Sequence, residues 1–196
     1  MSEGRRPGGR TERTRVAVLD ATLAELAERG YPALTVEAVA ARSGVHKTTI
    51  YRRWGSADGL LAAALERETG AGWTPPDTGS LAGDLRELVT ELVATFTDPA
   101  RAALPMAVLS AAFQSPAAAR ALRAFYADRQ GRAADIVRRA VARGEAPAGT
   151  DPVEVVRAAC APVFYRLVVT REPVDAAVAE RAAAAAVLAT RAATFT

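Results

Sequence analysis

Cysteine, histidine and lysine are nearly missing from this chain of 196 residues, which holds one of each: Cys160, His46 and Lys47. A single cysteine excludes an intrachain disulfide and is typical of a reducing compartment. One histidine and one distant cysteine also provide too few nitrogen and sulfur ligands for a transition-metal site. We therefore expect no metal and no cofactor, and Cys160 fits a small core residue better than a redox sensor.

Long apolar runs are missing as well. The first ten residues, MSEGRRPGGR, contain arginines, but the apolar segment that a signal peptide needs does not follow them. Elsewhere the apolar stretches are rich in alanine and interrupted by arginine, so none reaches the length of a membrane span. The sequence predicts a cytoplasmic protein that does not enter a membrane.

Alternating runs of β-branched residues, which would predict strands, are not found either. Apolar residues instead recur at steps of three and four, as Val16, Leu19, Leu23 and Leu26 do, which is the spacing of an amphipathic helix. Half of the residues are hydrophobic and 24% are charged, a globular composition. The chain is predicted to be all-α, with about nine helices near residues 11–29, 35–43, 46–54, 57–70, 81–97, 101–114, 116–143, 152–171 and 174–194.

The segment AGWTPPDTGS, residues 71–80, is rich in glycine and proline and marks the clearest domain boundary. Before it, we expect residues 1–11 to be a flexible basic arm and residues 12–72 to be a first helical domain. After it, residues 73–196 are expected to form a second helical domain. Pro162 lies inside a predicted helix of that domain, where proline bends the helix or removes one backbone hydrogen bond.

Acidic residues are absent between residues 42 and 53, in and around the stretch SGVHKTTIYRRWGS. The formal net charge of the chain is only +3, so the local distribution of charge carries more information than the total. Four cations stand in that acid-free segment: Arg42, Lys47, Arg52 and Arg53. A solvated helix face usually mixes its charges, whereas this composition suits a surface that contacts a polyanion.

The same stretch has the pattern of a helix-turn-helix, at about residues 35–54. Thr35 is a good N-cap for the first short helix, and Gly44 permits the tight turn before the second. At about 100° per residue, Ile50 and Trp54 fall on one side of the second helix, opposite Thr48. The apolar side would seat the helix, and the other side, with its hydroxyls and cations, could enter the major groove of DNA.

Residues 12–72 resemble the DNA-binding domain of the TetR family of bacterial transcriptional regulators. The resemblance lies in LTVEAVAARSGVHKTTIYRRWGSADGLLAAAL and in the amphipathic helix before it. It implies a homodimer that binds a palindromic double-stranded operator and is released by a small ligand in the carboxy-terminal domain. Repression is the usual outcome in the family. The later phrase APVFYRLVVTREPVD resembles a helix in one branch of the family.

The resemblance also assigns residues to DNA. Positions matching base contacts are occupied by Lys47 and Thr48, and Arg52 faces the groove at a variable position. His46 stands in place of a small capping residue, and Glu37 stands where some members carry a base-reading cation, so Glu37 is given no base contact. The remaining expected contacts are to the backbone, from Thr35, Thr49, Tyr51 (which could also reach a base) and Arg53, with Arg10 and Arg13 of the arm as further candidates.

The second domain would hold the ligand and the dimer contacts. No charged residue stands out there as a ligand anchor, so we expect an apolar or aromatic effector. The residues predicted to line its pocket are Phe96, Leu104, Met106, Leu109, Phe113, Phe125, Tyr126, Phe164 and Tyr165. The last two helices are rich in small residues and could pair with those of a second copy, through Val163, Leu167, Val178, Ala182, Ala185 and Leu188.

Two other functions compete with this prediction. A helical enzyme would need paired carboxylates, an activated nucleophile or a metal set, and none is visible at a useful spacing, so no catalytic residue is predicted. The alternative is a helical interaction or small-molecule-binding protein with a degenerate DNA-binding head. The uninterrupted cationic face argues against that alternative, and a sequence-specific, ligand-released repressor is the preferred prediction.

Overall fold

The computed structural model describes residues 8–69 and 72–196, and within these ranges it consists of nine α-helices and no strand. The predicted all-α fold is confirmed. The helices are α1 (Gly8–Arg29), α2 (Val36–Ser43), α3 (Lys47–Trp54), α4 (Ala57–Thr69), α5 (Leu81–Thr97), α6 (Pro99–Gln114), α7 (Pro116–Ala142), α8 (Pro152–Phe164) and α9 (Ala176–Arg191). Among the described residues, no helix is long and apolar enough to cross a membrane.

The helix boundaries differ from the prediction at two points. Helix α1 already begins at Gly8, so residues 8–11 are helical and do not belong to a flexible arm, while residues 1–7 lie outside the described part. Helix α8 ends at Phe164 and is followed by a π-helical turn, η2 (Tyr165–Thr170), instead of continuing as α-helix to residue 171. The irregularity expected from Pro162 therefore occurs just after it, as a change of helix type.

The chain divides into two compact units. One contains residues 1–71 and 103–125, and the other contains residues 72–102 and 126–196. Helix α6, from Ala103 on, and the first part of α7 thus belong with the amino-terminal helices. The functional division into residues 12–72 and 73–196 stays a prediction.

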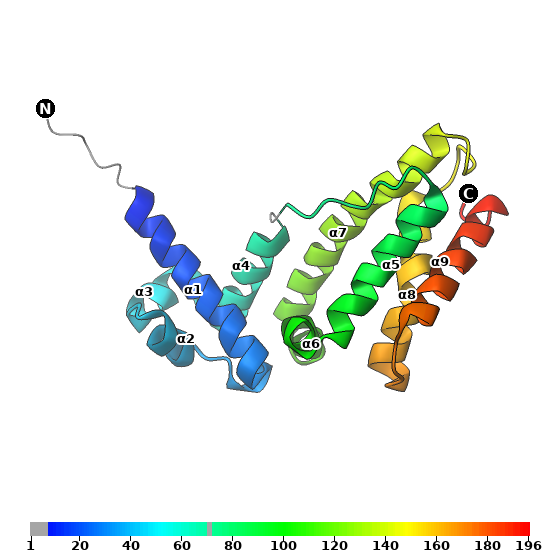
Figure 1. The fold of residues 1–196 in the computed structure, drawn as a ribbon. Helices are drawn as coiled ribbons and strands as arrows, with labels where there is room; N and C mark the ends of the chain where they lie inside the picture. Colours follow the sequence, from blue (N-terminus) through cyan, green and yellow to red (C-terminus); the bar gives the residue numbers. More distant parts are fainter. Residues whose placement is uncertain (1–7, 70–71) are drawn as a thin grey trace, which may run out of the picture. The chain divides into compact units, whose positions relative to one another are not determined.

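In the first unit, α1 packs against α2 and α4, and α3 packs against α2 and α4 (Figure 1). Of the apolar stripe predicted for α1, Leu19, Leu23 and Leu26 are buried, whereas Val16 is 37% exposed and lies outside the core. Leu60 and Leu61 of α4 are fully buried as well, and Val108 of α6 joins the same core. This core fixes the short helices α2 and α3 on a rigid base.

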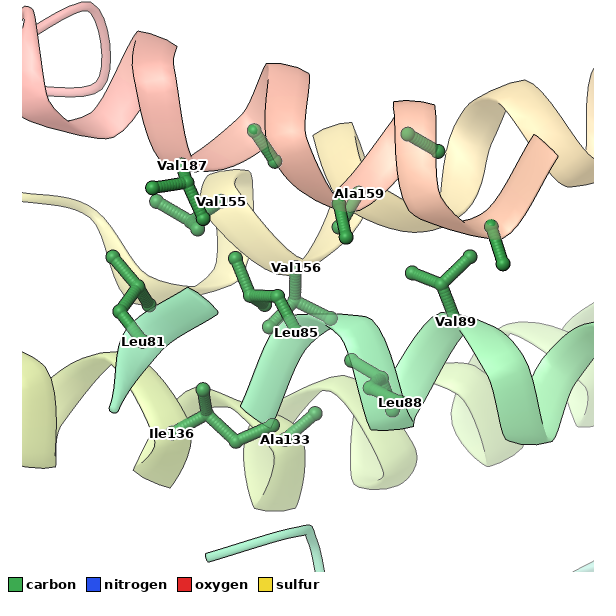
Figure 2. Close-up of a cluster of buried hydrophobic side chains, with 14 of the residues drawn as sticks. Leu81, Leu85, Leu88, Val89, Ala133, Ile136, Val155, Val156, Ala159 and Val187 are labelled. Carbon is green, nitrogen blue, oxygen red and sulfur yellow. The ribbon is translucent and has the colours of Figure 1, made fainter. Parts of the chain in front are cut away.

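In the second unit, α5, α8 and α9 pack on one another, and α7 supplies a fourth side of the core. Figure 2 shows Leu85 and Val89 of α5 directed toward Val156 and Ala159 of α8, with Ile136 of α7 on the other flank. Most of the buried side chains contributed by α8 and α9 are alanine or valine, so these helices approach α5 closely. Ser80 begins α5 by accepting a hydrogen bond from the Gly83 amide at 3.1 Å.

Candidate nucleic-acid interface

The α2–turn–α3 segment has the caps and the turn that the sequence predicted. The Thr35 hydroxyl accepts from the Ala38 amide at 3.1 Å, and Gly44 has the left-handed φ of 68° that the turn needs. His46 also serves as a cap: its Nδ1 lies 3.4 Å from the Thr48 amide, from which it accepts, and 2.9 Å from the Thr48 hydroxyl. The imidazole replaces a small capping residue without loss of the helix start.

Two residues of α3 seat the helix, as its helical periodicity predicts. Ile50 is fully buried in the core of the first unit, and Trp54 packs partly buried against the same core. Gly59 of α4 allows this close packing, because a Cβ on it would lie 1.9 Å from the Trp54 carbonyl oxygen. A side chain at position 59 would therefore displace the end of α3, a constraint that the sequence pattern did not reveal.

The opposite face of α3 is exposed and cationic. Lys47, Thr48, Arg52 and Arg53 are all exposed, and Tyr51 is 45% exposed. Within residues 8–69 and 72–196, no ion pair engages Lys47, Arg52 or Arg53, so their charges are available to a partner. The Arg53 guanidinium lies 5.1 Å from the centre of the Trp54 ring, a cation–π contact that holds its stem along the helix.

The other residues predicted to contact DNA are placed less uniformly. Thr35 is exposed but its hydroxyl caps α2, and Thr49 is half-buried. Arg13 is exposed on α1, while only the backbone of Arg10 falls within the described part. Both arginines therefore stand on a helix and not in a flexible arm.

Arg42, one of the four cations of the acid-free segment, forms ion pairs with acids of the same chain. Its Nε donates to Glu25 at 2.6 Å, and its two terminal nitrogens donate to Glu28. Hydrogen bonds to Glu28 and Glu25 raise the pKa of Arg42 above its usual value. Both acids lie on α1, 14 and 17 residues earlier, so the pairing ties α2 to α1 and removes Arg42 from the DNA-facing set.

Glu37, to which the family resemblance gives no base contact, also takes part in this surface. The Tyr51 hydroxyl donates to Glu37 Oε1 at 3.1 Å, which links the exposed faces of α3 and α2. This hydrogen bond to Glu37 raises the pKa of Tyr51. The proton expected to reach a phosphate is thus donated to a carboxylate in this structure.

A second group of hydrogen bonds, which the sequence did not predict, lies at the start of α4, the helix that packs against α3. We call it the Asp58 junction. Asp58, in the first turn of α4, accepts hydrogen bonds from the hydroxyls of Tyr31 and Ser115, the latter at 2.8 Å. Ser115 is buried and caps α7, because its oxygen accepts from the Ala117 and Ala118 amides at 3.2 Å. One carboxylate therefore connects the start of α4 to the start of α7 within the first unit.

The predicted pocket residues are distributed over both units. Three aromatic residues meet in the second unit: Phe96 and Tyr126 each stand edge-on to Phe164, with ring centres 5.6 and 5.7 Å apart. Burial raises the pKa of Tyr126 to about 12 and that of the Cys160 thiol to about 11. In the first unit Leu104 packs against the core, Phe113 is 81% exposed, and Met106, Leu109 and Phe125 are half-buried. Tyr165 is 57% exposed, so neither it nor Phe113 lines an enclosed pocket.

The predicted dimer residues also divide. Val163, Val178 and Ala182 are buried in the core of their own unit, and Leu167 packs against that core. Ala185 and Leu188 are exposed, Leu188 by 67%. The side chains available to a second copy are therefore those on the outer face of α9 and η2, and the buried three act as core residues.

Known proteins with the same features are regulators. A family model described as "Bacterial regulatory proteins, tetR family" matches residues 18–64, and one described as "Tetracyclin repressor-like, C-terminal domain" matches residues 75–186, more than half of the chain. The HTH-type transcriptional regulator AqdR of Rhodococcus erythropolis is 38% identical over 154 residues, covering 78% of this chain and 73% of AqdR.

Solved structures agree. The TetR family transcription regulator SCO0332 is 29% identical, with a TM-score of 0.69 over 89% of this chain and 97% of that one. A SmeT–triclosan complex, 24% identical with a TM-score of 0.63 over 92% of this chain and 90% of that one, has the same fold. The exposed cationic face of α3 and the buried residues that hold this helix fit these likenesses. The family models and the relative show that the chain belongs to the TetR family of bacterial transcriptional regulators, which are DNA-binding helix-turn-helix proteins and not enzymes.

Proposed function

We propose that this regulator is a repressor that binds a palindromic operator as a homodimer and leaves it when a small apolar or aromatic effector binds. The observation that carries the proposal is the outer face of α3, where Lys47, Thr48 and Arg52 are exposed and unpaired by acids within the described chain. Cations and hydroxyls at the start of a short helix can contact base edges and phosphates in the major groove. Such an encounter would take place in the bacterial cytoplasm, where the chromosome lies.

A second copy is proposed to pair through the outer face of α9 and the adjacent turn η2. Ala177, Ala184 and Leu188 are exposed on α9 at helical spacing, and Val169 of η2 is 64% exposed. Small side chains allow two helices to approach closely, and exposed large apolar side chains favour burial by a partner. Two copies would present two α3 helices to successive major grooves, which a palindrome requires.

The effector is proposed to bind next to the aromatic group formed by Phe96, Tyr126 and Phe164. Edge-to-face rings present both faces and edges to an aromatic guest. The Tyr126 hydroxyl, whose pKa burial raises to about 12, is protonated at neutral pH, as an ordinary tyrosine is. The bound triclosan in the SmeT complex is an example of a ligand in a protein of this fold. An effector acts only if it binds the DNA-released state more tightly than the DNA-bound state.

A signal from the effector is proposed to reach α3 through Asp58. Helix α7 runs from Pro116 to Ala142, and its first ten residues belong to the first unit together with α4. Asp58 accepts from the cap of α7, Ser115, and the next residue, Gly59, touches the end of α3. A shift at the start of α7 would thus change where α4 holds the recognition helix.

A gel shift on the DNA flanking the protein's own gene tests this proposal, because such regulators often control neighbouring genes. Wild-type protein is expected to retard one fragment in the presence of excess competitor, and Arg52→Ala is expected to weaken the complex at least about tenfold. Arg138→Ala is the matched control, since Arg138 is exposed on α7 and paired with Asp135. If Arg52→Ala binds the fragment as tightly as Arg138→Ala does, Arg52 does not contact DNA and the proposed surface of α3 is contradicted. Release by an aromatic compound such as triclosan tests the effector separately.

A further inference from the structure

Glu37 is the one acidic residue between positions 35 and 53, the segment that forms the DNA-facing surface. It is exposed near the start of α2, and it accepts a hydrogen bond from Tyr51 at 3.1 Å. A carboxylate at this place repels the phosphates that the neighbouring cations attract. It also interacts favourably with the amino-terminal end of α2, but that effect acts on helix stability and does not depend on Tyr51.

The hydrogen bond between Tyr51 and Glu37 determines which DNA groups the pair can contact. A tyrosine hydroxyl has one proton, and here it is directed at Glu37, so the hydroxyl oxygen offers lone pairs only. The carboxylate offers lone pairs only as well. Phosphate oxygens have no proton to donate, whereas the exocyclic amino groups of bases do. The pair is therefore matched to a donor on a base edge and not to the DNA backbone.

We propose that Glu37, oriented by Tyr51, reads the amino group of a cytosine in the major groove of each operator half-site, an inference that rests on the proposed operator binding. The hydrogen-bonding groups that guanine and thymine show in this groove are all acceptors, which repel a carboxylate, and the thymine methyl group offers it no hydrogen bond. Adenine has an amino group, but its own N7 and the O4 of the paired thymine flank that group with acceptors. The cytosine amino group has an acceptor on one side only, the O6 of the paired guanine, so cytosine is the preferred base.

Selection of binding sites from a random duplex library tests the proposal without a known operator. Full-length wild-type protein is expected to enrich a two-fold symmetric motif with a cytosine at one fixed position in each half. Glu37→Gln is expected to lose that preference by at least about fivefold and to gain adenine there, because an amide can bond adenine N6 and N7 together. Tyr51→Phe should weaken the cytosine preference without a gain of adenine.

Gel shifts with the selected duplex give the second measurement. Replacing the cytosine by thymine is expected to weaken wild-type binding about five- to tenfold per half-site and to change Glu37→Gln binding less than twofold. Asp135→Asn is the control, because Asp135 is an exposed acid on α7. Melting curves of each variant show whether the fold is kept.

The outcomes test operator binding and the base-reading role of Glu37 separately. If wild type and Glu37→Gln enrich the same base at every position, the reading role of Glu37 is overturned while operator binding stands. If wild type enriches no motif at all, operator binding itself is refuted, and the role of Glu37 with it. If Glu37→Gln changes the base preference of the motif only at the cytosine position of each half-site, both operator binding and the reading role of Glu37 are supported.

Discussion

Replacing Asp58 by alanine should lower the stability of the first unit measurably. The Asp58 carboxylate accepts one hydrogen bond from Tyr31 and one from Ser115, at 2.8 Å for the latter. A hydrogen bond to a charged group contributes about 1.5–3 kcal/mol to stability. Because Asp58 is half-buried, we take the lower value for each bond, so Asp58→Ala should reduce the free energy of unfolding by about 3 kcal/mol.

For a chain of this size, 1 kcal/mol corresponds to about 2–4 °C in melting temperature, so the expected decrease is about 6–12 °C. Thermal unfolding followed by circular dichroism at 222 nm measures it. Asp135→Ala is the control, because its ion pair with Arg138 leaves both side chains 56% exposed and should contribute less than about 0.5 kcal/mol. A decrease for Asp58→Ala no larger than that of the control would refute the junction.

The same junction predicts a dependence on alkaline pH. Burial, followed by the hydrogen bond to Asp58, raises the pKa of Tyr31 above the ordinary tyrosine value of about 10. A raised pKa means that the protonated hydroxyl is the form that stabilises the fold. The contribution of Tyr31 is therefore complete below about pH 10 and is lost as the pH rises further. Tyr31→Phe should lower stability at pH 8 and flatten this alkaline decline, which urea titrations at several pH values can measure.

The other predictions concern binding, the thiol and assembly. If about eight phosphates are neutralised per dimer, the logarithm of affinity should fall with the logarithm of salt concentration at a slope near −7, and a flat response would remove the phosphate contacts. Lys47→Ala should abolish operator binding yet keep the melting temperature, and wild-type binding by this variant would place the interface elsewhere. Because burial raises the pKa of Cys160 to about 11, a disulfide reagent at pH 8 should label unfolded protein quickly and folded protein slowly. Leu188→Glu should convert a dimer to a monomer in sedimentation, and an unchanged mass would exclude this face of α9.

The seat and the exposed face of α3 could be predicted from sequence because both depend on local geometry. A helical period of 3.6 residues is enough to put Ile50 and Trp54 on the side opposite Thr48. The partners of Arg42 could not be predicted in this way, because Glu25 and Glu28 lie on another helix and meet it only after packing. The same limit hid the contact of Tyr51 with Glu37, 14 residues earlier.

The roles of residues in the second half of the chain were harder to predict from sequence, for a related reason. Helix α9 is rich in alanine on several sides, so its sequence does not tell a core-facing stripe from an outward one. Val178 and Ala182 were therefore predicted to face a second copy, although both are buried in their own unit. Phe113 was assigned to a pocket by its residue type alone, and it is 81% exposed. Tertiary packing, which the local pattern does not encode, decided each of these positions.

The way in which α3 packs against the core has a consequence for protein engineering. Ile50, with Trp54 beside it, holds the helix to the core, while Lys47, Thr48 and Arg52 project away from it. Substitutions at the projecting positions therefore meet few packing constraints, and additivity is expected between them and changes in the core. The protein is thus a suitable starting point for libraries randomised at those three codons. Repressors for new promoters can be selected from such libraries without compensating mutations that restore stability.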